Sequence, residues 1–245
     1  MPIALLVMVV QIVLIVHAAK TGRFNPWGYI LIFLPGAGAL AYILVELAPE
    51  WFGSAPGQRT RGRVVKTLDP ERRYRELADQ FAAVDTIGTR GALAEECLVL
   101  GKYWAALEHF NEILARPHGS EPVYMLGRAR AEFGLGRFSD TVATLDELRS
   151  KWPEYQSAEG HLLYARALEG ADQLKEAVDE YAAVSNYYPG AEARVRYGLL
   201  LRKVGRDQEA EALFADLLAQ MRRAPRYVRK VQAEWIRIAE RAVRG

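Results

Sequence analysis

Few residues of this chain have side chains suited to catalysis or metal binding, and their spacing matches no known site. The chain has four histidines and one cysteine. His109 and His118 lie nine positions apart, with no carboxylate or cysteine at ligand spacing. A single cysteine, Cys97, excludes both an internal disulfide and a cysteine-built zinc site. We therefore expect no resident metal, and we expect Cys97 to be a thiol buried within a helix.

Motifs for phosphate binding and nucleophilic catalysis are missing as well. Gly-x-Gly occurs at Gly36/Gly38 and at Gly134/Gly136. The first pair lies in an apolar run and the second falls at a turn between helices, so neither is placed to cradle a phosphate. No serine lies in a Gly-x-Ser-x-Gly turn, and Glu95–Glu96 lies on a solvated helical face. The sequence predicts no catalytic residue and no cofactor, and we expect a protein that is not an enzyme.

One unit, written four times, organises residues 87–224. Its marker is a turn residue, with a small residue five positions later and a large apolar residue nine positions later. The turn residues are Gly101, Gly136, Asp172 and Gly205, which are 35, 36 and 33 positions apart. Each copy holds two helix-length apolar patterns, and the first carries a small residue where helices must cross: Ala94, Ala129, Ala165 and Gly198. Because one helix pair cannot bury its apolar stripe alone, the copies are expected to stack.

A period near 34 residues with this pattern resembles the tetratricopeptide repeat. The resemblance implies an all-α fold, an α-solenoid of four repeats at about 87–120, 122–155, 158–190 and 191–224. The aromatic residue that often opens such a repeat is missing, and its slots hold Arg90, Met125, His161 and Arg194. In this family the first helices of successive repeats line a concave groove that holds a protein or peptide.

The register of that family places a set of candidate binding residues in the groove. They are Leu126, Arg130, Phe133, Leu162, Arg166, Leu199, Arg202 and Lys203. Arg130 and Arg166 occupy equivalent places in adjacent repeats, and with Arg202 they would form a basic column. Such a column suits a peptide carboxylate or an acidic segment, because arginine binds carboxylates bidentately. The alternative is that these are ordinary surface arginines paired with neighbouring glutamates.

Charge is distributed unevenly along the chain. Residues 59–75 carry seven Lys/Arg and two Asp/Glu, and residues 221–245 carry eight and two. Residues 76–220 carry 15 Lys/Arg and 24 Asp/Glu. An acidic array between two basic flanks favours oriented placement near an anionic surface over nucleic-acid binding.

Two apolar runs precede the repeats. The first, Ile3–Ala19, is interrupted only by Gln11 and His17 and would span about 25 Å as a helix. The second, Trp27–Leu47, is long enough to cross a hydrocarbon core. We interpret residues 1–52 as a two-helix transmembrane hairpin, with a cleaved secretory signal as the alternative for the first run. This interpretation predicts a two-span protein of the bacterial inner membrane, and the distribution of basic residues favours a cytoplasmic array.

The second apolar run also resembles a known membrane hairpin. Trp27, Pro35-x-x-Gly38 and Tyr42 are similar to the N-terminal segment of bacterial cardiolipin synthases and related phospholipase-D-type proteins. The enzyme is not implied, because no histidine is followed two residues later by the lysine that the His-x-Lys-x4-Asp box requires.

The repeats are flanked by a basic linker and two further helical patterns. Residues 53–68 are rich in Pro, Gly and Arg, and this linker is either a solvated tether or a site for lipid headgroups. The headgroup candidates are Arg59, Arg61, Arg63 and Lys66. Residues 69–86 read as a capping helix or a partial repeat that starts at Asp69-Pro70, and 225–245 as a basic capping helix.

The sequence as a whole predicts a membrane-anchored scaffold or adaptor that holds a protein or peptide partner on its repeats. Membrane lipids would contact the hairpin and the basic flanks. The alternative is an accessory factor in phospholipid metabolism or in envelope or cytochrome assembly. No pattern predicts nucleic-acid binding, and the oligomeric state is left open.

Overall fold

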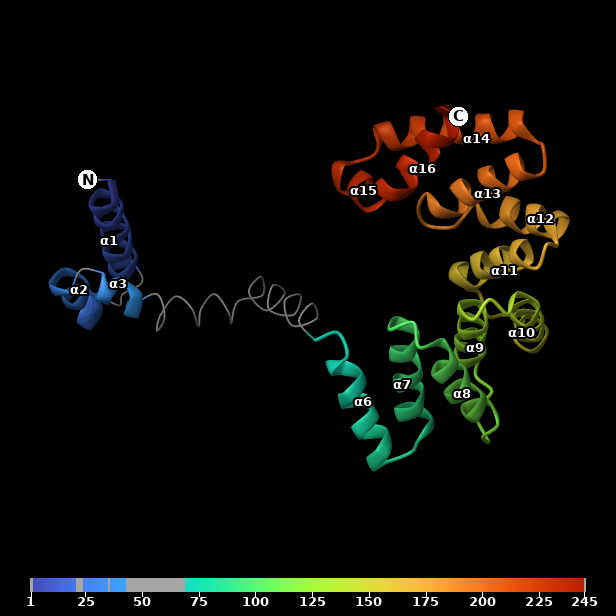
Figure 1. Ribbon diagram of the computed structural model, residues 1–245, viewed down its shortest axis with the longest axis horizontal. Helices are drawn as coiled ribbons and strands as arrows, with labels where there is room; N and C mark the ends of the chain where they lie inside the picture. Colours follow the sequence, from blue (N-terminus) through green and yellow to red (C-terminus); the bar gives the residue numbers. More distant parts are fainter. Residues whose placement is uncertain (1, 21–23, 35, 43–68, 245) are drawn as a thin grey trace. The chain divides into compact units, whose positions relative to one another are not determined.

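The computed structural model describes residues 2–20, 24–34, 36–42 and 69–244. Its contacts divide the chain into two compact units, residues 1–72 and 73–245, which we describe in turn. Every regular element among the described residues is a helix, as the all-α prediction requires. Figure 1 shows the order of the helices along the chain.

The first unit contains three helices, α1 (Pro2–Lys20), α2 (Phe24–Phe33) and α3 (Ala37–Tyr42). Their shared apolar core consists of Leu14, Ala18, Leu31 and Tyr42. The polar residues of the first apolar run find partners inside this unit. The Gln11 side chain donates to the Leu31 carbonyl, and His17 Nδ1 lies 3.0 Å from the Tyr42 hydroxyl.

The described residues include no helix that is long and apolar enough to cross a membrane. The run predicted as one span forms instead α2, with 10 residues, and α3, with 6, which are about 15 Å and 9 Å long against a core of about 30 Å. Gly36, at φ +88°, lies between them and ends the helical path. The predicted transmembrane hairpin is therefore unsupported, and the prediction of a two-span inner-membrane protein is wrong. Residues 43–52 of that prediction, and the linker at 53–68, lie outside the described residues.

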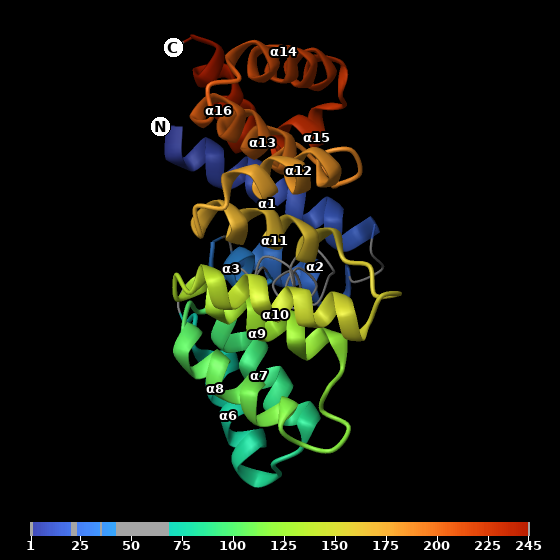
Figure 2. The ribbon, with the colours of Figure 1, turned by 90° about the vertical axis from the view of Figure 1, so that its right-hand side faces the viewer.

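The second unit is a run of helices joined by short turns. They are α6 (Arg72–Ala83), α7 (Ile87–Val99), α8 (Tyr103–Leu114), α9 (Pro122–Gly134), α10 (Phe138–Lys151), α11 (Ala158–Gly170), α12 (Leu174–Val184), α13 (Glu192–Lys203), α14 (Asp207–Arg223), α15 (Arg226–Val231) and α16 (Ala233–Arg244). Each helix from α7 to α14 packs on the next one in the chain. Figure 2 shows α7 to α14 as successive layers.

The first helix of every pair ends in the same backbone motif. Gly101, Gly136 and Gly205 have φ of +70°, +74° and +80°, and Asp172 has φ of +60° at the equivalent position. In the first copy the Gly101 amide donates to the Leu98 carbonyl (3.1 Å) and the next amide donates to the Cys97 carbonyl (2.8 Å). The same two bonds recur in the other three copies. This left-handed C-terminal cap sets where each second helix starts.

The repeat positions predicted from the sequence form the core of the array. Ala94, Ala129 and Ala165, at the predicted helix crossings, are fully buried. The large apolar residues nine positions after each turn are buried as well: Phe110, Leu145, Tyr181 and Phe214. A Cβ added at Gly198 would lie 2.5 Å from the Phe214 ring, so only glycine allows this crossing.

A second close contact joins each of the first two repeats to the repeat that follows. A Cβ on Gly134 would lie 2.4 Å from the Tyr103 ring, and one on Gly170 would lie 2.6 Å from the Phe138 ring. The aromatic residue opens the second helix of one repeat, and the glycine ends the first helix of the next. At the third junction both residues change, to Leu174 and Lys203. In parallel, α7 packs on α9 and α9 packs on α11, whereas contacts between α11 and α13 are sparse.

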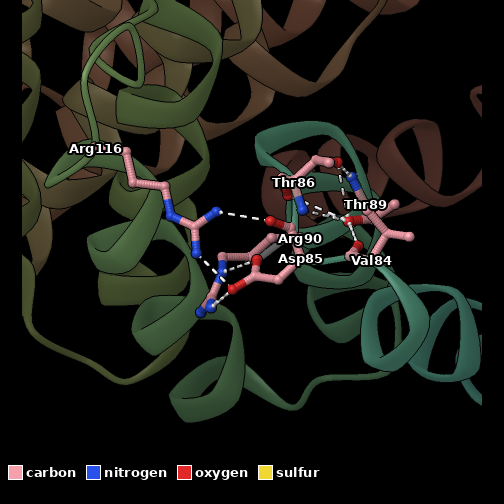
Figure 3. Close-up of polar contacts among 6 residues, drawn as sticks. All are labelled: Val84, Asp85, Thr86, Thr89, Arg90 and Arg116. Carbon is pink, nitrogen blue, oxygen red and sulfur yellow. Dashed lines mark hydrogen bonds and ion pairs between the residues drawn. The ribbon is translucent and has the colours of Figure 1, made fainter.

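The loop that precedes the first repeat is fixed by one carboxylate (Figure 3). Asp85 accepts from Arg90 (2.7 Å) and from Arg116 (2.6 Å), which follows α8. These two guanidinium groups hold the pKa of the Asp85 carboxyl well below its usual range. Thr86 caps α7 by accepting from the Thr89 amide (3.1 Å), and the Thr89 hydroxyl in turn accepts from the Thr86 amide (3.0 Å).

The C-terminal segment forms two helices rather than the one predicted. α15 ends at Val231, and α16 starts after Gln232, whose side chain accepts a hydrogen bond from the Ala191 amide (3.0 Å). Trp235 and Ile238 pack against the core of the last repeat. Val231, at the end of α15, is 75% exposed.

Candidate functional site

The first helices of the repeats line a concave cavity of about 550 Å³. Five of the eight predicted groove residues line it, namely Leu126, Arg130, Phe133, Leu162 and Arg166. They come from α9 and α11, which approach closely at Gly160, where an added Cβ would lie 3.3 Å from the Leu126 side chain. Tyr103, Glu159, Tyr188 and Glu192 complete the polar and aromatic part of the wall.

Arg166 is the most unusual side chain of this cavity. Its guanidinium carbon lies 4.5 Å from the centre of the Phe133 ring, a cation–π contact. Burial lowers the pKa of the guanidinium from its usual value, and the nearby Arg196 lowers it further. The buried Nε has no hydrogen-bond partner among the described residues. A buried donor without an acceptor costs free energy, which an incoming oxygen ligand would recover.

Arg130 differs from Arg166 although both lie six residues before a turn residue. Arg130 forms an ion pair with Glu95 at 3.0 Å, and both side chains are more than two-fifths exposed. Glu95 itself lies six residues before Gly101, so the pair joins equivalent positions of neighbouring repeats. The charge of Arg130 is therefore largely compensated, as the surface-pair alternative expected, whereas no ion pair joins Arg166 to a carboxylate among the described residues.

Arg202 and Leu199 do not line this cavity. Arg202 lies three residues before Gly205 and thus belongs to a different row from Arg130 and Arg166. Its guanidinium carbon lies 5.8 Å from the centre of the Phe214 ring, and its buried Nε also lacks a partner among the described residues. The position equivalent to Arg166 in the last repeat is Leu199, which is 40% exposed.

A second cavity, of about 460 Å³, lies beside the first. Phe133 and Arg166 line both cavities, and Lys203 lines only the second. Lys203 occupies the place that Gly134 and Gly170 hold in the preceding repeats. Arg196 also lines the second cavity, and its Nε pairs with Glu192 at 2.8 Å.

Two lining residues that the sequence analysis missed lie outside the first helices. Tyr103 opens a second helix, and Tyr188 lies in the connection after α12. The equivalence of Tyr103 with Phe138, each two residues after a turn glycine, was a usable signal for the first of them. No sequence pattern marks Tyr188, because it lies outside the repeated turn and helix-crossing positions.

The cysteine and two of the histidines, which could in principle bind a metal or act as nucleophiles, have packing or hydrogen-bonding roles. No cluster of three or more metal-ligating side chains occurs in the described part of the chain. Cys97 is buried, as predicted, and burial raises the pKa of its thiol. His161 bonds to Tyr187 and Glu180, and His109 packs edge-on against Phe81. The predicted headgroup candidates Arg59, Arg61, Arg63 and Lys66 lie outside the described residues.

Comparison with solved structures shows the fold. MamA residues 41 to the end from Desulfovibrio magneticus RS-1 aligns with 67% of this chain and 93% of its own, at 14% identity and a TM-score of 0.56. A MamA RS-1 ArsTM double mutant aligns over 67% and 92%, with the same identity and TM-score. TTC0263, a thermophilic TPR protein of Thermus thermophilus, aligns over 71% and 96%, at 20% identity and a TM-score of 0.50.

The second unit is thus a tetratricopeptide-type helical array, as the repeat pattern predicted. No protein-family model matches the sequence, and no curated protein matches it either. The resemblance of residues 27–42 to the hairpin of cardiolipin synthases has no support from a family match.

Proposed function

We propose that the repeat array is a protein–protein interaction scaffold that binds a peptide segment of a partner through a carboxylate. The observation that carries this proposal is the environment of the Arg166 side chain. Its guanidinium is held over Phe133, faces a cavity of about 550 Å³, and has a buried Nε without an acceptor among the described residues. The tetratricopeptide-type fold of the array supports the proposal, since stacked repeats present extended concave binding surfaces.

The cavity wall also suggests what surrounds the carboxylate in the ligand. Leu126 and Leu162 provide apolar surface beside Arg166. Glu159 lines the same cavity, and no ion pair joins it to a basic residue among the described residues. A peptide with an acidic group, an apolar side chain and a basic group would complement this wall.

Selection of random peptides displayed on phage against the full chain supplies the probes for a test. Binding of the selected, fluorescein-labelled peptides is then measured by anisotropy. Arg166→Ala is expected to weaken binding about tenfold, because a charge-assisted hydrogen bond to a guanidinium contributes about 1.5–3 kcal/mol. Arg130→Ala, whose charge Glu95 already compensates, is expected to weaken it only about twofold.

Arg149→Ala is the matched control. Arg149 also lies over a ring, at 4.6 Å from the centre of Tyr164, but it is paired with Glu180 and lies outside both cavities of the groove. Its replacement should leave the affinity unchanged. Selected peptides that bind equally well to the double variant Arg130→Ala plus Arg166→Ala would contradict the proposed site.

A further inference from the structure

A second concave surface lies at the C-terminal end of the array, away from the repeat groove. It is built from α14, α15 and α16 and encloses about 590 Å³. Figure 1 shows these three helices at the C-terminal end of the chain. Its floor is apolar, with Met221, Ile236 and Val243, and Val243 is 50% exposed. We call this surface the C-terminal groove.

Four arginines surround the floor of the C-terminal groove: Arg222, Arg229, Arg237 and Arg244. Glu240 is the one acidic residue of the lining. The Arg237 Nε donates to the Ala233 carbonyl (3.2 Å). No ion pair joins any of the four to a carboxylate within the described ranges.

Some arginines elsewhere in the last repeat are paired, whereas Arg202 forms no ion pair among the described residues. Arg196 pairs with Glu192 (2.8 Å), and Arg206 pairs with Glu209 (2.6 Å). A helix that only covers the end of an array needs a polar outer face, and neutral or mixed charges satisfy that need. A capping helix does not need four arginines around an exposed apolar floor. Their like charges repel one another unless a ligand of opposite charge lies between them.

We propose that the C-terminal groove docks an acidic amphipathic helix of a partner protein. Apolar residues of that helix, at positions i, i+3, i+4 and i+7, would lie on the floor formed by Ile236 and Val243. Flanking Asp or Glu side chains would pair with the surrounding arginines, which bind carboxylates in a planar, two-bond geometry. The concave form favours a helix over an anionic lipid surface, since a flat surface contacts the arginines without reaching the floor.

This docking site is separate from the peptide groove of the proposed function. The two share no lining residue, so the variants that test one leave the other intact. The probe is a fluorescein-labelled helical peptide of about five turns, with leucine at the four spaced positions and glutamate beside them. Its control is the same peptide with glutamine in place of every glutamate.

Binding to the full chain is measured by anisotropy at two salt concentrations. The acidic peptide is expected to bind at least tenfold more tightly than the glutamine peptide, and added salt should reduce that difference. The triple variant Arg222→Gln, Arg229→Gln, Arg237→Gln should lose about tenfold in affinity. A matched triple variant, Arg223→Gln, Arg226→Gln, Arg241→Gln, removes the same charge from the same three helices but outside the groove, and it should bind like the unchanged protein.

Val243→Asp tests the apolar floor, and Val231→Asp, at a more exposed site outside the groove, is its control. The first should lose binding and the second should retain most of it, with circular dichroism showing equal helix content in both. Equal losses in the two arginine triples would overturn the docking site and leave only general charge attraction. Vesicles of anionic phospholipid that bind the full chain and displace the acidic peptide, with binding lost in the groove triple only, would overturn the helical partner and assign the groove to lipid.

Discussion

The first two junctions between repeats differ from the third in one pair of positions. Tyr103 lies on Gly134, and Phe138 lies on Gly170, so backbone and ring are in direct contact. At the third junction a leucine replaces the aromatic ring, and Lys203 replaces the glycine. There, α11 and α13 share few contacts.

This difference shows that two side chains can change the packing at a repeat junction while the spacing of the repeats stays the same. The glycine lets the end of a first helix lie against the aromatic ring that opens the preceding second helix, whereas a lysine and a leucine occupy these two positions at the third junction. The cavity of about 460 Å³ reaches both the second and the third junction, because Phe138 and Gly170 line it together with Lys203. We call the first two junctions closed and the third junction open, and Tyr103 and Gly134 of the first closed junction also line the cavity of about 550 Å³.

The largest effect is expected from filling a closed junction. Gly170→Leu would place a side chain inside the Phe138 ring, and overpacking of this kind costs about 3 kcal/mol. The free energy of unfolding, measured by urea titration, should fall by that amount.

Lys203→Leu introduces leucine at the equivalent position of the open junction. It should change the free energy of unfolding by less than about 0.5 kcal/mol. Gly170→Leu combined with Phe138→Ala should recover much of the loss. If both leucine variants were equally stable, the glycine and the lysine would not distinguish the junctions.

A second comparison concerns the position four residues before each turn. It holds Cys97, Leu168 and Leu201 in three repeats and Glu132 in the second, where it is 6% exposed. Burial raises the pKa of the Glu132 carboxyl, against the opposing effects of the Thr144 hydroxyl, which donates to it at 2.7 Å, and of Arg128. The folded protein therefore binds the carboxyl proton of Glu132 more tightly than the unfolded chain does. The contribution of Glu132 to stability is fully present below the pKa of the unfolded chain, near 4.5, and it is lost as the pH rises through the higher pKa of the folded protein.

Glu132→Gln keeps an acceptor for Thr144 and removes the charge. We expect it to raise the free energy of unfolding at pH 7 by about 1.5 kcal/mol and to flatten the decline in stability above pH 4.5. Urea titrations across pH 4 to 8 measure both effects. A variant that is less stable than the unchanged protein at pH 7 would mean that Arg128 compensates the buried charge fully.

The smallest effect is expected at the turn positions. Asp172 has φ of +60°, where its glycine counterparts lie without strain. Asp172→Gly should raise the free energy of unfolding by about 0.5–1 kcal/mol, and Gly136→Asp, the reverse change, should lower it by about 1 kcal/mol. Thermal melting followed by circular dichroism would show melting temperatures that shift in opposite directions, and shifts of the same sign would contradict this explanation.

The period of the repeats could be predicted because it depends on local features. Turn residues such as Gly101, and small residues such as Ala94, are required wherever helices end or cross, and they recur at visible spacing. Five of the eight predicted groove residues line the cavity for the same reason. Arg202 was misplaced because its nearest turn residue is three positions away rather than six, a shift that side-chain type alone does not reveal.

Features that depend on distant partners were not predictable. The end of α15 at Gln232 is accompanied by a hydrogen bond to an amide 41 positions earlier. The buried Glu132 reads as an exposed helical residue until Thr144 is placed beside it. The run Trp27–Leu47 was interpreted as one span from its composition, whereas its described part ends one helix at Phe33 and starts another at Ala37.

The bond between Gln232 and Ala191 has a consequence for how the array opens. Most contacts in a stacked array are between neighbours, so its ends are expected to open first. This bond joins the start of α13 to the connection between α15 and α16, and α16 packs on both α13 and α14. The last repeat and the two terminal helices should therefore open together, as one cooperative unit, and their amide hydrogens should report the same free energy of opening in hydrogen exchange.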